Sequence, residues 1–183
     1  MNIESRAAIC GILILALGGC GTVDNSPGMI TDVRVVINEL VPQNQIPDAA
    51  GNSYDWVELY NPMDRTVVLQ GYFLSDNVTK WYKYELPASS AIGPGGYLVL
   101  RADGESVDPT IMPFGLGADG DRLVFSNPEG KLIDSVDYVK AKANQSFARF
   151  PNGSGKFAWC ATTTPDADNG TSCEIAIGDA PTE

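Results

Sequence analysis

Turn sequences divide most of this chain into short segments. From residue 32 onwards, apolar and polar residues alternate over short runs, and Gly, Pro and Asn separate these runs, as in Gly93-Pro94-Gly95-Gly96 and Pro151-Asn152-Gly153. No stretch of about 11 residues or more in this region keeps the 3.6-residue spacing of an amphipathic helix. The pattern excludes a helical bundle and predicts an all-β chain whose strands are joined by tight turns.

Eight apolar runs are the expected strands. Most of them carry β-branched or aromatic residues at alternate positions, as do strands with one face against a core. Their ranges are 33–40, 54–60, 67–74, 81–86, 97–101, 123–126, 132–139 and 146–150. About eight or nine short strands at this spacing predict a two-sheet sandwich or a barrel.

The composition excludes several kinds of catalytic centre. The 183 residues include no His, and the net charge is −11. Without His there is no Ser-His-Asp relay, and zinc lacks its usual nitrogen ligand, so catalysis would have to use carboxylates, Lys or Tyr. Nucleic-acid binding needs clustered Lys and Arg, whereas the nearest approach to a cluster is Lys80 and Lys83 in an acidic chain. We therefore expect no nucleic-acid partner.

The N-terminus is expected to be a targeting segment. Arg6 precedes an apolar run over residues 7–17, which is shorter than the ~20 residues of a membrane-spanning helix and typical of a signal peptide. The following Leu17-Gly18-Gly19-Cys20 resembles a bacterial lipobox, in which the Cys is lipid-modified and becomes the first residue after cleavage. The resemblance implies a lipoprotein signal peptide over residues 1–19. An ordinary secretory signal with an incidental Cys is the alternative.

This segment sets the expected location of the protein. A lipid on Cys20, followed by a flexible polar tether over residues 20–31, would attach the folded part to a membrane. The expected location is the bacterial cell envelope, and the outer membrane if the host has two membranes.

Two cysteines remain for the folded part. Cys10 would leave with the signal peptide and Cys20 would carry lipid, which leaves Cys160 and Cys173. In an exported domain such a pair predicts one disulfide. A two-Cys metal site is the competing interpretation, disfavoured because His and a CxxC spacing are both missing.

Seven segments, in order along the chain, resemble the bacterial lamin tail domain. They are VINEL (36–40), DWVELYN (55–61), VLQGYFLSD (68–76), IGPGGYLVL (92–100), GDRLVF (120–125), IDSVDY (133–138) and SFARFPNG (146–153). The resemblance implies an immunoglobulin-like β-sandwich, commonly a non-catalytic module of exported bacterial proteins. We place this domain at residues 32–173, with a C-terminal tail at 174–183. Arg149 is expected to form an architectural ion pair with Glu58 or Asp76.

Acidic residues near the ends of three expected strands form a candidate metal site. The fold could bring their carboxylates together, and such hard oxygen ligands suit calcium. The four residues are Glu39, Asp55, Glu58 and Asp76. The alternative is that they are solvated strand ends, and no cofactor other than calcium is suggested.

A cluster of aromatic residues forms a candidate interaction surface. In an alternating strand, Trp81 and Lys83 share one face while Tyr82 and Tyr84 share the other, so at least one aromatic face is expected to be partly exposed. Exposed rings offer a large contact area at low entropic cost, which suits recognition of a protein or a glycan. The alternative is a strand that is buried on both faces or a solvated edge strand.

Three kinds of function are therefore considered. The first is a non-catalytic, envelope-anchored lipoprotein that displays a lamin-tail-like module to an envelope protein or glycan. The second is a carboxylate-based hydrolase using residues such as Asp55 and Glu58, and the third is a calcium-dependent binding module. Asp55 and Glu58 are three residues apart in one expected strand, so their side chains point to opposite faces. We therefore expect a binding or structural module and no enzyme.

Overall fold

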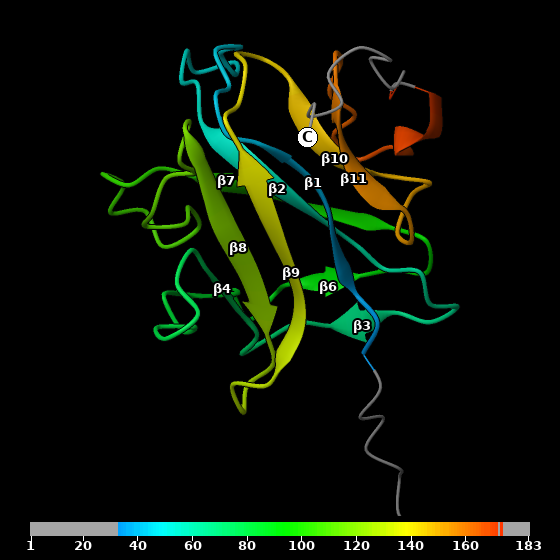
Figure 1. Ribbon diagram of the computed structural model, residues 1–183. Coiled ribbons are helices and arrows are strands. Elements are labelled where there is room, and N and C mark those ends of the chain that lie inside the picture. The colour runs from blue at the N-terminus through cyan, green and yellow to red at the C-terminus, as the bar shows by residue number, and fades with distance from the viewer. Residues whose placement is uncertain (1–32, 172, 174–183) are drawn as a thin grey trace, which may run out of the picture. The chain divides into compact units, whose positions relative to one another are not determined.

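The computed structural model describes residues 33–171 and residue 173 (Figure 1). The expected signal peptide, the lipidation site Cys20, the tether and the C-terminal tail lie outside the described residues. No helix in the described part of the chain is long and apolar enough to cross a membrane.

The described residues form eleven strands and one short 3₁₀ turn, which confirms the expected all-β fold class. The strands are β1 Val36–Val41, β2 Asp55–Tyr60, β3 Val67–Val68, β4 Phe73–Ser75, β5 Tyr84–Glu85, β6 Ala91–Ile92, β7 Tyr97–Ala102, β8 Gly120–Ser126, β9 Leu132–Val139, β10 Ser146–Phe150 and β11 Lys156–Cys160. The 3₁₀ turn η1 covers Asn169–Thr171.

The strands pair into antiparallel sheets. The five-stranded sheet has the order β11-β10-β1-β2-β7, the four-stranded sheet has the order β5-β4-β8-β9, and β3 pairs with β6 in a separate two-stranded sheet. Strand β10 therefore returns from late in the sequence to lie beside β1, and Figure 1 shows the β10–β11 hairpin next to the η1 turn.

The main core lies between the five-stranded and four-stranded sheets. Ile37 and Leu40 of β1 and Leu59 of β2 contribute from one side, and Leu74 of β4 and Phe125 of β8 contribute from the other. A break in the β1–β2 register between Ile37 and Glu39 allows both Ile37 and Leu40 to face this core although they are three residues apart. Glu39 and Glu58, which lie opposite each other in the register, face the other side of the sheet.

The single strand expected over residues 67–74 is wrong. It consists of two strands, β3 and β4, that belong to different sheets. Gly71 between them has φ +77°, and the N–H of Tyr72 bonds the carbonyl of Leu69 at 3.1 Å in a turn. A residue with this φ cannot continue a strand, and Gly adopts it most readily because it has no Cβ.

The expected strand over residues 81–86 is also wrong, because only Tyr84 and Glu85 are extended in β5. Side chains fold the preceding residues into turns. Asn77 Oδ1 accepts the N–H groups of Thr79 and Lys80, and Ser75 Oγ donates to the carbonyl of Lys80 at 2.8 Å. These local bonds offer the backbone an alternative to a β-ladder. Trp81 and Tyr82 therefore lie in a turn and do not alternate across a sheet.

Candidate functional site

The aromatic turn, defined here as residues 77–83, presents one strongly exposed ring. Tyr82 is 59% exposed, whereas Tyr84 is only 4% exposed and donates its hydroxyl to the carbonyl of Thr110 at 3.2 Å. Trp81 is half-buried, and its ring meets the rings of Phe73 and Tyr82 edge-on with centroids 5.1 and 5.3 Å apart. The expected surface is therefore corrected to Trp81 and Tyr82, since Tyr84 belongs to the core.

The backbone beneath the aromatic turn fits the indole of Trp81 closely. A Cβ added to Gly130, in the loop between β8 and β9, would lie 2.6 Å from the Trp81 ring. On the other side of the turn, Lys83 forms an ion pair with Asp76, and its Nζ lies 5.7 Å from the centre of the Phe114 ring. The turn is thus held from below while Tyr82 and Val78, which is 52% exposed, face solvent.

Glu39 and Glu58 form a second notable arrangement, a pair of carboxyl groups on neighbouring strands. Both residues are fully buried. The chain after β11 lies over them: the Thr164 N–H donates to Glu39 Oε1 at 3.0 Å, and the Asp166 N–H donates to Glu58 Oε2 at 2.6 Å. Asn38 Nδ2 also donates to Glu58 Oε1 at 3.0 Å.

We call this covering segment, residues 161–171 and 173, the C-terminal strap. Its anchor is Asn169, which is buried: Nδ2 donates to the carbonyls of Asn38 and Arg149 at 3.2 and 3.1 Å, and Oδ1 accepts the Thr164 hydroxyl at 2.8 Å. The strap begins after Cys160 and returns to it through the Cys160–Cys173 disulfide, which confirms the predicted pairing.

Burial controls the protonation of the Glu39–Glu58 pair. Loss of hydration raises the pKa of Glu58 to about 7, although hydrogen bonds from Asn38 and Asp166 oppose the shift. The negative charges of Glu39 and Asp166 raise this pKa further. Burial also raises the pKa of Glu39, opposed by hydrogen bonds from Ser146 and Thr164.

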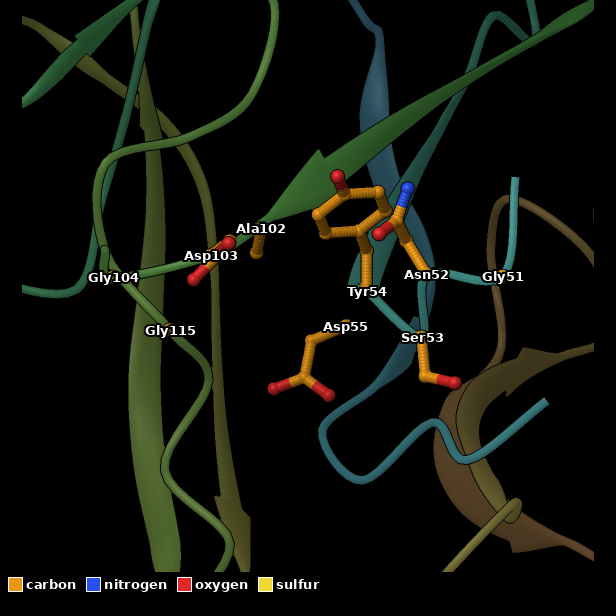
Figure 2. A pocket seen from close by; sticks show the side chains of 9 residues that line it. All are labelled: Gly51, Asn52, Ser53, Tyr54, Asp55, Ala102, Asp103, Gly104 and Gly115. Carbon is orange, nitrogen blue, oxygen red and sulfur yellow. The ribbon is translucent and has the colours of Figure 1, made fainter. Parts of the chain in front are cut away.

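Asp55 lies at the start of β2 and lines an open pocket of about 690 Å³. Figure 2 shows the carboxylates of Asp55 and Asp103 and the ring of Tyr54 around this pocket. Asp55 Oδ1 accepts the Asn44 N–H at 3.2 Å, and the Leu116 N–H also bonds this carboxylate. Burial, assisted by the negative charge of Asp103, raises the pKa of Asp55 to about 6. Its oxygens therefore hold two loops together at the pocket.

The four carboxylates proposed as a metal site do not come together. Glu39 and Glu58 lie under the strap, Asp55 lies at the pocket, and Asp76 pairs with Lys83. The expected convergence fails because Asp55 and Glu58 project from opposite faces of β2 and Asp76 follows β4 in the other sheet. Within residues 33–171 and 173, no group of three or more His, Cys, Asp or Glu residues could hold a metal ion.

Neither the strap nor the pocket is predicted from the sequence. The Cys160–Cys173 pair was a usable signal for the strap, because a disulfide from the end of a strand forces the intervening residues to fold back near it. The pocket had no such signal, since Asp55 and Asp103 meet only through the pairing of β2 with β7.

Two packed antiparallel sheets, with β10 returned beside β1, define an immunoglobulin-like β-sandwich. The family model of the lamin tail domain matches residues 31–140, and the chain belongs to this family. The family's fold is that of a typically non-catalytic interaction module. The match includes β1 to β9 and ends before β10, β11 and the strap. No curated protein matches the chain.

Proposed function

We propose that this chain is a non-catalytic interaction module of the bacterial cell envelope, attached to a membrane by a lipid on Cys20. The observation that carries the proposal is the lamin-tail sandwich, a fold that is typically non-catalytic. The buried carboxyl groups of Glu39 and Glu58 accept hydrogen bonds from backbone N–H groups, which is a structural use of these side chains. The lipobox-like sequence that ends at Cys20 supports the anchor. In a host with two membranes, the outer membrane is the proposed location.

The aromatic turn is the proposed contact surface for an envelope protein or glycan. Tyr82 and Val78 expose apolar area on a turn that Asn77 and Ser75 hold in one conformation through side-chain hydrogen bonds. A preorganised aromatic surface loses little entropy on binding. The half-buried Trp81 ring beneath Tyr82 extends the same surface.

The anchor is tested by Cys20→Ala in the native host. We expect the variant to lose labelling by a radioactive fatty acid and to leave the membrane fraction, while the unmodified chain keeps both properties. Labelling that persists in Cys20→Ala would disprove the proposed lipidation site.

The contact surface is tested with the Cys20→Ala chain recovered outside the membrane fraction and added to isolated envelopes. Tyr82→Ser should lower the bound fraction, whereas Leu132→Ser, a similarly exposed apolar position on β9, should not. Prior digestion of the envelopes with a protease or a glycan hydrolase then separates a protein partner from a glycan. Equal binding by the two variants would remove the aromatic turn from the proposal.

A further inference from the structure

The C-terminal strap and the two glutamates beneath it have the parts of a conformational switch. We propose that the strap is a proton-linked latch: its closure over β1 and β2 retains a proton on the Glu39–Glu58 pair, and the Cys160–Cys173 disulfide keeps it closed. The inference is independent of the aromatic turn and of any partner that binds there.

The strap separates the two carboxyl groups from water. Glu39 and Glu58 are opposite each other in the β1–β2 register, and neither side chain is exposed. The strap itself is largely exposed, so it is a single layer of chain between these carboxyl groups and water. The Thr164 and Asp166 N–H groups on the strap bond the two carboxyl groups directly. Opening the strap therefore exchanges these bonds for bonds to water.

The charges that act on the pair are negative. Glu39 comes from β1 and Glu58 from β2, while the strap contributes Asp166 and Asp168. The hydroxyl of Tyr97 on β7 accepts a hydrogen bond from Asn152 Nδ2. Burial raises the pKa of this phenol, and the negative charges of Asp168 and Glu58 add to the rise. The Arg149 side chain projects from the opposite face of the sheet, where it binds Asp134. The charges that act on Glu58, those of Glu39 and Asp166, are both negative.

Burial, assisted by these charges, sets the direction in which pH acts on the latch. With the strap closed, burial raises the pKa of Glu58 to about 7 from an ordinary 4.5, and it raises the pKa of Glu39 in the same direction. With the strap open, water hydrates both carboxylates and these shifts are relieved. The closed state therefore binds protons more tightly than the open state. Closure is strongest at acidic pH and weakens as pH rises through about 7.

The disulfide restrains the same movement covalently. A dithiol reductant breaks the Cys160–Cys173 bond, leaves a thiol on each cysteine and is itself oxidised to a cyclic disulfide. Residue 173 is then no longer tied to the end of β11, so opening no longer has to occur within a closed loop. Reduction and neutral-to-alkaline pH together should release the strap and expose Asn38, Glu39, Glu58 and Ala148 on the outer face of the sheet.

Hydrogen exchange of the full chain, followed by NMR, measures this opening. The Thr164 and Asp166 amides report on the strap, and the Leu123 amide in β8 serves as an internal reference. Protection factors corrected for intrinsic exchange are compared at pH 5.5 and pH 8, with the disulfide intact and after reduction. In the reduced chain we expect strap protection to fall by up to about 30-fold between these pH values, the ratio set by a pKa change from 4.5 to 7.

Two variants and a control identify the groups responsible. Glu58→Gln removes the titration and should abolish most of the fall, and Glu39→Gln should reduce it because the Glu39 charge raises the pKa of Glu58. Glu85→Gln, an exposed carboxyl on β5, should behave as the unmodified chain. Because each variant is judged by the ratio of its protection factors at the two pH values, any pH-independent loss of stability cancels. Strap protection that does not change with pH after reduction, or an undiminished fall in both variants, would overturn the latch.

Discussion

Arg149 on β10 binds both carboxylate oxygens of Asp134 on β9, and the pair joins the two sheets of the sandwich. Arg149 Nη2 lies 2.9 Å from Oδ1 and 2.8 Å from Oδ2. The same two side chains bind the backbone of Ile37: Arg149 Nε donates to its carbonyl at 2.8 Å, and Asp134 Oδ2 accepts its N–H at 2.9 Å. The β1–β10 register pairs only Glu39 and Leu40 of β1, so these side chains bind β1 beyond the end of that pairing.

The expectation that Arg149 pairs with Glu58 or Asp76 is therefore wrong. Ala148 packs against Cys160 and Cys173 on the outer face of the sheet, so the next residue, Arg149, points to the opposite face. Glu58 lies on the outer face under the strap, and Asp76 is occupied by Lys83. Because the Arg149 side chain projects from the inner face of β10, it reaches Asp134 and not Glu58.

Replacing Arg149 should destabilise the sandwich strongly. Arg149→Met leaves the Asp134 carboxylate without its partner in a largely buried position, which typically costs about 3 kcal/mol. Arg149→Lys should recover only part of this loss, because Lys cannot make the two-oxygen contact together with the bond to Ile37. Urea denaturation gives the free energies of unfolding. Arg122→Met, which breaks the exposed pair with Asp137, is the control, and an equal loss there would contradict the structural role of Arg149.

The aromatic residues of the corrected surface should differ sharply in their contribution to stability. Tyr82→Ser removes an exposed ring and should change the free energy of unfolding by less than about 0.5 kcal/mol. Tyr84→Ser removes a buried ring of the main core and should cost about 3 kcal/mol or more. Thermal melting of both variants checks the difference. Similar losses would mean that Tyr82 is also part of the core.

The fit between Gly130 and Trp81 can be tested by adding one methyl group. Gly130 has φ +78°, and its new Cβ would lie 2.6 Å from the indole, so Gly130→Ala should both strain the backbone and displace the ring. Gly95→Ala is a matched control, because Gly95 has φ +62° but nothing within 4 Å of its Cβ position. We expect Gly130→Ala to melt at a clearly lower temperature than Gly95→Ala. Equal melting temperatures would show that the indole moves aside without cost.

Strand pattern predicted the longer elements well. The ranges expected for 132–139 and 146–150 coincide with β9 and β10, because several alternating residues in a row fix both the type of element and the buried face. Strands of two or three residues carry no measurable period, so the sequence does not predict β6 and does not separate β3 from β4. The five-residue β11 was missed as well.

The sites were harder to predict than the strands. The side chains of Asn77 and Ser75 bond the backbone of Thr79 and Lys80 and turn the chain there. The strand that the following residues indicated therefore forms only at Tyr84 and Glu85. The carboxyl groups were recognised as candidates, but their grouping depends on the register of β1 with β2 and on a strap that begins after Cys160. Neither is visible in the local sequence.

The disulfide makes a chemical prediction that is independent of the latch. The oxidised chain should be two hydrogens lighter than the reduced chain, and a digest should contain Cys160 and Cys173 in one linked fragment. The double variant Cys160→Ser/Cys173→Ser should lose about 3 kcal/mol of unfolding free energy, because the unfolded chain is no longer restrained by the loop. Two free thiols in protein purified from an oxidising compartment would refute the pairing.

The pocket carboxyl of Asp55 should make stability depend on pH in a definite direction. Its pKa is about 6 in the folded chain and near 3.8 when solvated, so the folded state binds this proton more tightly than the unfolded state. The favourable contribution of this bound proton to the free energy of unfolding is fully present below about pH 4 and is lost as pH rises through about 6. Asp55→Asn cannot titrate, so its stability relative to the unmodified chain should rise by about 1 to 2 kcal/mol between pH 4 and pH 8. Denaturation of both chains across this range measures the difference. Because Glu39 and Glu58 titrate in both chains, their contributions cancel, and a difference that stays constant with pH would show that Asp55 is not the group responsible.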